Sequence, residues 1–336
     1  MVGQRFVQLL HNHPTFEISV LAASEKSVGK QYAEACRWVL DEDIPSQVGD
    51  IIVSSIEPSG HAKIVFSALP ASVAREKEPL FAEAGYHVCS NTSAFRQEPD
   101  VPLIIPEVNA GHLELIDVQR RQRGWSGSIL TSPNCTTTTI VMALKPLDDA
   151  FGVKRLFATT MQAVSGGGHP GISYLDIVDN IIPNIEGEEE KIEKETCLLL
   201  GKIVDGRRIA KEIVISVQTN RVPVVDGHMA SLSIGFEEKP TVEEAIRVLS
   251  EYRGPESVRD LPGAPKHPVI VHSAKDRPQP RRDRNSAAGM VATVGRVRVC
   301  PLLDLRLVVV THNAIRGAAG GAVLNAELLV ASGYLQ

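Results

Sequence analysis

The stretch SPNCTTTT at residues 132–139 separates two regions of the chain that differ in texture. Pro133 stops an apolar run at 128–131, so the pattern predicts a helix over 135–145 that begins with the thiol of Cys135. Before this stretch, short Val- and Ile-rich runs alternate with helix-like segments, which predicts an open parallel α/β sheet. After it, fewer and longer runs predict an α+β domain with a large, mixed and mainly antiparallel sheet.

The apolar runs place the expected elements along the chain. In the first region the strand-like runs are 16–23, 50–54, 63–69, 86–89, 103–106 and 128–131, and a helix is expected over 71–84. In the second region they are 155–164, 213–225, 230–236, 290–299 and 305–311, and the Pro- and Arg-rich stretch 254–284 reads as an extended loop. We therefore expect a dinucleotide-binding domain over 1–134 plus 315–336, with a C-terminal helix, and a catalytic and oligomerisation domain over 135–314.

The start of the chain lacks an expected element. Residues 2–10 read as a helix with no strand in front of it, whereas a complete dinucleotide-binding fold opens with a strand and a glycine-rich turn. The first strand of the fold is thus expected to be missing, and the edges of its neighbours to be exposed. The sequence fits either a chain shortened at its start or a divergent form with weaker cofactor affinity.

Composition and charge exclude several classes of protein. The 336 residues are 43% hydrophobic and carry a formal net charge of -5, which argues against a nucleic-acid-binding protein. No apolar run is long enough to cross a membrane and no secretory signal opens the chain, so we expect a cytoplasmic protein. The five widely spaced cysteines form no C-x-x-C pair and indicate neither a disulfide framework nor a metal site.

Cys135 is the cysteine whose position suits chemistry. A helix N-terminus presents unpaired backbone N–H groups and the positive end of the helix dipole, both of which favour the thiolate. The same N–H groups could hold a developing oxyanion. The pattern therefore predicts an ionised nucleophile here, whereas the other four cysteines lie in ordinary strand or helix patterns.

A histidine is the natural partner for a thiol, because its side chain exchanges protons near neutral pH. Of the ten histidines, His228 follows Asp226-Gly227 at a turn between two strand-like runs, where a bend can aim its ring into a cleft. Arg221 lies seven residues earlier and can face the same pocket. Gln162 ends a strand-like run just before three glycines, so its amide could orient an acyl group.

Together these segments resemble the aspartate-semialdehyde dehydrogenase family, especially its archaeal and fungal branch. The resemblance covers nearly the whole chain and rests on motifs in a shared order at 134–147, 162–168, 170–171, 175–183, 187–191, 220–228 and 316–320. Asn-Cys-Thr-Thr alone also looks like the glyceraldehyde-3-phosphate dehydrogenase site. The order of the motifs is what makes the resemblance specific.

The resemblance implies roles for individual residues. Cys135 would be the nucleophile, His228 the general acid/base and Gln162 a residue that positions the substrate. The substrate ligands that it implies are Arg221 for the α-carboxylate, Glu189 for the ammonium group, Arg96 and Lys191 for phosphate, and Asn134 beside the thiol. From the residues alone, the acidic run 188–191 equally fits a solvated helix start, and Arg96 a surface arginine.

The resemblance also implies NADP(H) as the cofactor. Ser24, Lys26 and Ser27 follow the second expected strand and suit a 2′-phosphate, which favours NADPH over NADH. Glu25 departs from the arginine expected in this loop. The further cofactor contacts that the resemblance implies are Val2, Gly3, Ser67, Ala68, Asn91, Ser165, Gly166 and Asn325.

The expected activity is NADPH-dependent reductive dephosphorylation of L-4-aspartyl phosphate to L-aspartate 4-semialdehyde through a cysteine thioester. We expect a homodimer or homotetramer with no nucleic-acid or membrane partner. Two alternatives stay open at this point. One is a catalytically weak, truncated paralog that serves as an oligomer partner, and the other is a related acyl-phosphate or acyl-CoA reductase.

Overall fold

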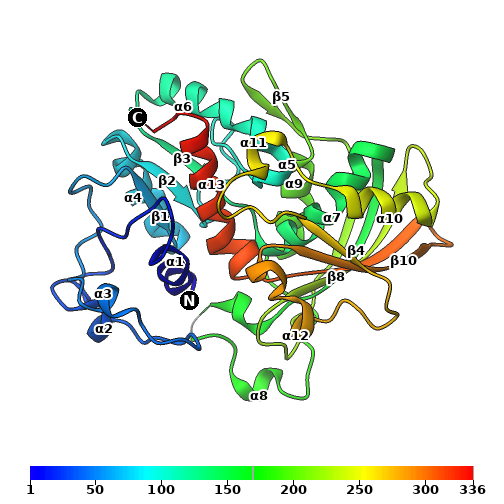
Figure 1. Ribbon diagram of the computed structural model, residues 1–336, viewed down its shortest axis with the longest axis horizontal. Helices are drawn as coiled ribbons and strands as arrows, with labels where there is room; N and C mark the ends of the chain where they lie inside the picture. The colour runs from blue at the N-terminus through cyan, green and yellow to red at the C-terminus, as the bar shows by residue number, and fades with distance from the viewer. Residues whose placement is uncertain (169, 336) are drawn as a thin grey trace.

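The computed structural model describes residues 1–168 and 170–335, which build two sheets with helices packed on them (Figure 1). The first sheet is parallel, in the order β1-β2-β3, and its strands are Ile64–Ser67, His87–Ser90 and Ser128–Thr131. Successive side chains of a strand point to opposite faces. Val88 accordingly packs in the cluster of α4 (Ala71–Glu83), and Cys89 in that of α1 (Val2–Leu10) and α13 (Gly320–Ala331). Helices therefore cover both faces, as the α/β pattern predicts.

The second sheet is mixed and lies on the other side of the molecule (Figure 1). Its order is β7-β4-β8-β11-β10-β9, with β4 (Val153–Met161), β7 (Val214–Gln218), β8 (His228–Phe236), β9 (Val269–His272), β10 (Ala292–Val299) and β11 (Leu305–Thr311). One face packs on α7 (Cys135–Phe151), α9 (Glu188–Leu199) and α10 (Val242–Glu251). The opposite face leaves Phe157 49% exposed.

Short elements connect these layers. A hairpin of β5 (Lys202–Val204) and β6 (Arg207–Ile209) extends from the end of α9. The remaining helices are α2 (Tyr32–Ala35), α3 (Ser46–Gly49), α5 (Pro106–Asn109), η1 (Ala110–Glu114), α6 (Leu115–Arg123), η2 (Val164–Gly167), α8 (Tyr174–Ile177), α11 (Glu256–Arg259), α12 (Pro280–Asp283), η3 (Ser286–Gly289) and η4 (Ile315–Ala319). No helix in the described ranges is long and apolar enough to span a bilayer.

Several predicted elements need correction. The runs 16–23, 50–54 and 103–106 form only isolated bridges, such as Ala22 to Ser54, because none of them has a neighbour along its whole length. The stretch 254–284 is not a plain loop, since it contains β9 at the edge of the mixed sheet. The helix α7 also continues past Pro146 to Phe151, because Leu147 is buried in the core and Phe151 packs against it.

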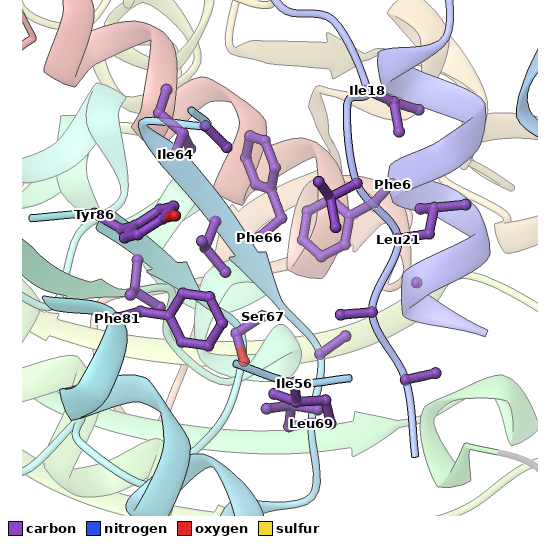
Figure 2. Close-up of a pocket in the computed structure, with 18 of the residues that line it drawn as sticks. Phe6, Ile18, Leu21, Ile56, Ile64, Phe66, Ser67, Leu69, Phe81 and Tyr86 are labelled. Atoms are coloured by element: carbon purple, nitrogen blue, oxygen red, sulfur yellow. The ribbon is translucent and has the colours of Figure 1, made fainter. Parts of the chain in front are cut away.

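A cavity of about 700 Å³ separates residues 16–23 from β1 (Figure 2). Phe6, Ile18 and Leu21 lie on one side of it and Ile64 and Phe66 on the other. No backbone hydrogen bond joins the two segments in the described part of the chain. Residues 16–23 and β1 therefore face each other across the cavity without pairing as neighbouring strands.

The backbone groups beside this cavity lack strand partners. The carbonyl of Leu21 and the N–H of Ala23 pair with Ser54, and the carbonyl of Ser67 pairs with Asn91 on the β2 side. Neighbouring residues of a strand point their N–H and C=O groups to opposite sides. Because Leu21 and Ala23 point theirs at Ser54, Ala22 and every second residue from it turn theirs toward the cavity. The groups of alternate residues in β1 face them from the opposite wall.

A buried ion pair connects the C-terminal segment to the first region. Arg316 in η4 and Glu107 in α5 approach to 2.5 Å between Nη2 and Oε2, and both side chains are 1% exposed. Arg316 Nη2 also lies 3.5 Å from Met142 Sδ in α7. Removing one member of such a pair leaves the other charge buried without a counterion.

We expect Arg316→Leu to lower the free energy of unfolding by about 3–5 kcal/mol, because Glu107 would then be buried as an unpaired carboxylate. The matched control is Arg247→Leu, which removes the pair with Glu251 at 3.7 Å on the exposed surface of α10 and should cost about 0–1 kcal/mol. Denaturant unfolding followed by circular dichroism measures both. Equal losses in the two variants would contradict this account.

Candidate active site

Asn134 caps the helix that begins with Cys135. Its Oδ1 accepts hydrogen bonds from the backbone N–H groups of Thr136 at 2.8 Å and Thr137 at 3.1 Å. The sequence pattern leaves the N–H groups at this helix start available for an oxyanion, and the cap occupies those of Thr136 and Thr137. A cap of this kind stabilises a helix by about 1 kcal/mol and fixes the backbone that carries the thiol.

The thiol and the predicted imidazole meet. Cys135 Sγ lies 3.2 Å from His228 Nε2, across the junction between α7 and the first residue of β8. Nδ1 of the same ring accepts the backbone N–H of Ala163 at 3.1 Å. A neutral imidazole protonates only one ring nitrogen, so the proton of His228 sits on Nε2 and points at the sulfur.

The surroundings keep both groups neutral. Burial raises the pKa of the Cys135 thiol to about 12; the carboxylate of Glu188 adds to the rise, while Arg96 and Arg221 oppose it. Burial, together with the positive charge of Arg221, lowers the pKa of His228 to about 3. The helix N-terminus favours an ionised thiol, whereas burial of the sulfur and the carboxylate of Glu188 favour the neutral form by raising its pKa. Cys135 nevertheless keeps a partly exposed surface for an incoming substrate.

Arg221 lies against the same pair. Its Nη1 donates to the carbonyl of Ala163 at 2.8 Å, and the side chain is buried. A Cβ on Gly166 would lie 2.8 Å from Arg221 Nη1 and 3.0 Å from His228 Cε1. A glycine at position 166 is therefore needed for this close approach.

The helix α9 directs carboxylates at the start of α7. Glu188 Oε1 accepts hydrogen bonds from Asn134 Nδ2 at 2.9 Å and from Thr136 Oγ1 at 3.3 Å. The predicted ammonium ligand, Glu189, instead accepts from the backbone N–H of Thr219 at 2.9 Å and from its hydroxyl at 3.1 Å. The sequence analysis missed Glu188 as a separate site residue.

A signal for Glu188 was present in the sequence. In α9 the buried positions include Glu188, Ile192, Glu195 and Leu199. This spacing of four, three and four residues follows one helical face. Two carboxylates that share a face with Ile192 and Leu199 must point inward, whereas Glu190 points to solvent.

The other predicted substrate residues lie around Cys135 and His228 or on α9. Gln162 follows the end of β4 and is buried, and its backbone bridges to Arg221, which follows the end of β7. Arg96 is buried and donates from Nη2 to the carbonyl of Asn91 at 3.0 Å. Lys191 is half-buried on α9.

Three predicted cofactor residues have buried polar atoms without a partner in the described ranges. They are Ser67 Oγ at the end of β1, Asn91 Nδ2 after β2 and Asn325 Oδ1 in α13. Native structures rarely leave such atoms unpaired, so these positions suit a polar ligand at the carboxyl ends of the parallel strands. The remaining predicted positions are spread out: Val2 and Gly3 in α1, Ser24, Lys26 and Ser27 near the cavity and the following turn, Ala68 after β1, and Ser165 and Gly166 in η2.

The fold and the site together define a class of protein. A parallel sheet with polar ligand positions at its carboxyl end is joined to a mixed sheet, and a thiol and an imidazole meet at the junction. This is the arrangement of a thiol-dependent oxidoreductase of the dinucleotide-binding kind.

Comparison with known proteins agrees with this class. The family description "Semialdehyde dehydrogenase, NAD binding domain" matches residues 1–116, and "Semialdehyde dehydrogenase, dimerisation domain" matches residues 144–316. Aspartate-semialdehyde dehydrogenase of Methanothermobacter thermautotrophicus is 49% identical over 98% of this chain and 96% of its own length. The chain belongs to the aspartate-semialdehyde dehydrogenase family, which confirms the resemblance.

Solved structures show the same fold. The crystal structure of the Candida albicans aspartate-semialdehyde dehydrogenase with NADP aligns with a TM-score of 0.92 at 42% identity, and covers 99% of this chain and 96% of that one. The crystal structure of aspartate semialdehyde dehydrogenase II from Vibrio cholerae aligns with a TM-score of 0.76 at 28% identity, and covers 98% of this chain and 95% of that one. The predicted fold class, a dinucleotide-binding domain with a mixed-sheet domain, is confirmed.

We expect the alkylation rate of Cys135 by iodoacetamide to keep rising through pH 10, because its thiolate fraction grows until a pKa of about 12. The lowered pKa of His228 means that no step should occur near pH 6.5. Peptide mass mapping of timed samples measures the rate, and Cys135→Ser identifies the labelled peptide. A plateau between pH 6 and 8 would show a resting thiolate–imidazolium pair and contradict the structure.

Proposed function

We propose that this chain catalyses the NADPH-dependent reductive dephosphorylation of L-4-aspartyl phosphate to L-aspartate 4-semialdehyde, with Cys135 as the nucleophile. The observation that carries the proposal is the 3.2 Å contact between Cys135 Sγ and His228 Nε2, beside the buried guanidinium groups of Arg96 and Arg221. The names of the relatives support the reaction, and the comparisons give no support to a weak paralog or a different acyl reductase.

The neutral state of the pair determines how the protons move. Attack by the Cys135 sulfur forms the C–S bond and breaks the C–O bond to phosphate. Because His228 Nε2 already carries a proton, the thiol proton leaves with the phosphate rather than with the imidazole. The Nε2–H of His228 then donates a hydrogen bond to the sulfur while the sulfur gains or loses negative charge. This hydrogen bond is the contribution of His228 to attack and to collapse.

The charged groups match the ends of the substrate. We assign Arg221 to the α-carboxylate and Arg96 with Lys191 to the phosphate, since arginine suits planar and tetrahedral oxyanions. Glu189 accepts from Thr219, whereas the carboxylate of Glu188 accepts from Asn134 beside the nucleophile and raises the pKa of the thiol, so we assign the ammonium group to Glu188. Gln162 keeps its predicted role in orienting the acyl group.

NADPH, when bound, supplies the hydride that reduces the thioester. The unpaired atoms of Ser67, Asn91 and Asn325 fit a polar ligand at this edge of the sheet. Ser24, Lys26 and Ser27 would hold the 2′-phosphate, and the Candida albicans relative was solved with NADP.

We further propose a cytoplasmic homodimer that forms through the open face of the mixed sheet. The matching family description calls this region a dimerisation domain. Phe157 is 49% exposed in β4 of the sheet, and an exposed aromatic side chain is typical of an interface. A homotetramer would require a second contact besides this face.

We expect Cys135→Ala to lower phosphate-dependent oxidation of L-aspartate 4-semialdehyde by 10³-fold or more, on the order seen when a nucleophile is removed. NADPH formation followed by absorbance measures the rate. Cys197→Ala is the matched control, because its thiol lies elsewhere, on the middle of α9 next to the carbonyl of Ile213, and should keep the activity. Substantial turnover by Cys135→Ala would refute the thioester route.

We expect Lys26→Glu to weaken NADPH binding about tenfold, as for loss of one charge-assisted hydrogen bond, and to leave NADH binding unchanged. Fluorescence titration with both nucleotides measures this. Lys30→Glu, in the same exposed turn region, is the control. An equal loss for NADPH and NADH would show that Lys26 does not read the 2′-phosphate.

A further inference from the structure

Glu195 connects Arg96 to Asn134, the residue before the nucleophile, and has no role in the function proposed above. This buried carboxylate on α9 is 1% exposed. Its Oε1 accepts from Arg96 Nη1 at 3.2 Å, and its Oε2 accepts from the backbone N–H of Asn134 at 2.6 Å. One side chain therefore holds the guanidinium assigned to phosphate and the residue directly before the nucleophile.

The same arginine is also held through its backbone. Arg208 in β6 donates from Nη1 to the carbonyl of Arg96 at 3.0 Å and from Nη2 to the carbonyl of Glu98 at 2.5 Å. Both Glu195 and Arg208 belong to the catalytic region, whereas Arg96 lies in the loop after β2 of the dinucleotide-binding sheet. The loop is thus fixed across the junction of the two sheets.

This bridge has two properties that a general structural contact lacks. Arg96 is 8% exposed and its Nε has no partner in the described ranges, so one N–H of the guanidinium remains available for an anion. Asn134 donates two hydrogen bonds to α9, from its side-chain Nδ2 to Glu188 and from its backbone N–H to Glu195. The distance from the phosphate-binding arginine to the sulfur is then set by one helix.

We propose that Glu195 is a positioning residue that holds Arg96 in register with Cys135, and that Arg208 supports it by holding the Arg96 backbone. The proposal rests on the proposed function, because it takes Arg96 as a phosphate ligand. Attack of the sulfur on the acyl carbon needs that carbon and the departing phosphate placed together. An error of about 1 Å in this placement can cost on the order of 100-fold in rate.

The test is Glu195→Gln in the full chain, assayed as oxidation of L-aspartate 4-semialdehyde with varied inorganic phosphate. Glutamine still accepts the Asn134 N–H but has no charge for Arg96. We expect the KM for phosphate to rise about tenfold, with the KM for semialdehyde and for NADP⁺ nearly unchanged, and the melting temperature to fall because Arg96 loses a buried counterion. Glu190→Gln, at an exposed position of the same helix, is the control and should alter none of these.

A second variant covers the case in which Glu195→Gln does not fold. Arg208→Lys cannot reach both carbonyls, so it should raise the KM for phosphate in the same direction, whereas Arg207→Lys, at the exposed neighbouring position, should not. If Glu195→Gln folds but raises all three KM values together, Glu195 is structural only and the proposal is overturned.

Arg96→Ala separates this proposal from the one on which it rests. If Arg96→Ala raises the KM for phosphate while Glu195→Gln and Arg208→Lys leave it unchanged, the positioning role fails and the phosphate assignment stands. If Arg96→Ala leaves the KM for phosphate unchanged, the phosphate assignment fails and the positioning role fails with it.

Discussion

The removal of water from the Cys135 sulfur is the constraint on which the rest of the site depends. A thiol whose pKa lies near 12 is protected from premature reaction, but it attacks only if its neighbours stabilise charge as the substrate arrives. His228 does so with an N–H that the Ala163 backbone fixes in direction. Arg96 and Arg221 add positive charge near the sulfur. The pair is best described as a neutral donor and acceptor that act during attack.

The helix α9 relates this chemistry to the two-sheet architecture. The nucleophile stands at the start of α7, where the parallel sheet ends and the mixed sheet begins. Carboxylates on one face of α9 reach the cap of α7 from the side of the mixed sheet, and Arg96 reaches Glu195 on the same helix from the other side. Catalytic geometry in this protein is therefore a property of the junction rather than of either sheet.

The sequence predicted the elements and residues whose signals are local. Pro133 before Cys135 and the Asp-Gly turn before His228 both mark changes in chain direction. The side chains of Cys135 and His228 do meet. The resting charge of the thiol could not be predicted, because desolvation depends on distant segments such as α9 and the Arg221 loop. The choice between Glu188 and Glu189 required the helical phase of the whole of α9, and the acidic run alone hides that phase. Runs such as 16–23 have the composition of strands, but a strand also needs a neighbour.

The cavity beside β1 has a consequence for how the molecule opens. Residues 16–54 contact the parallel sheet across it through side chains, with the ring centroids of Phe16 and Phe66 at 6.2 Å. Contacts of this kind confer little cooperativity without a shared ladder of backbone hydrogen bonds. We therefore expect the segment that carries Ser24, Lys26 and Ser27 to open as a local unit, which would couple nucleotide affinity to how often that unit is closed.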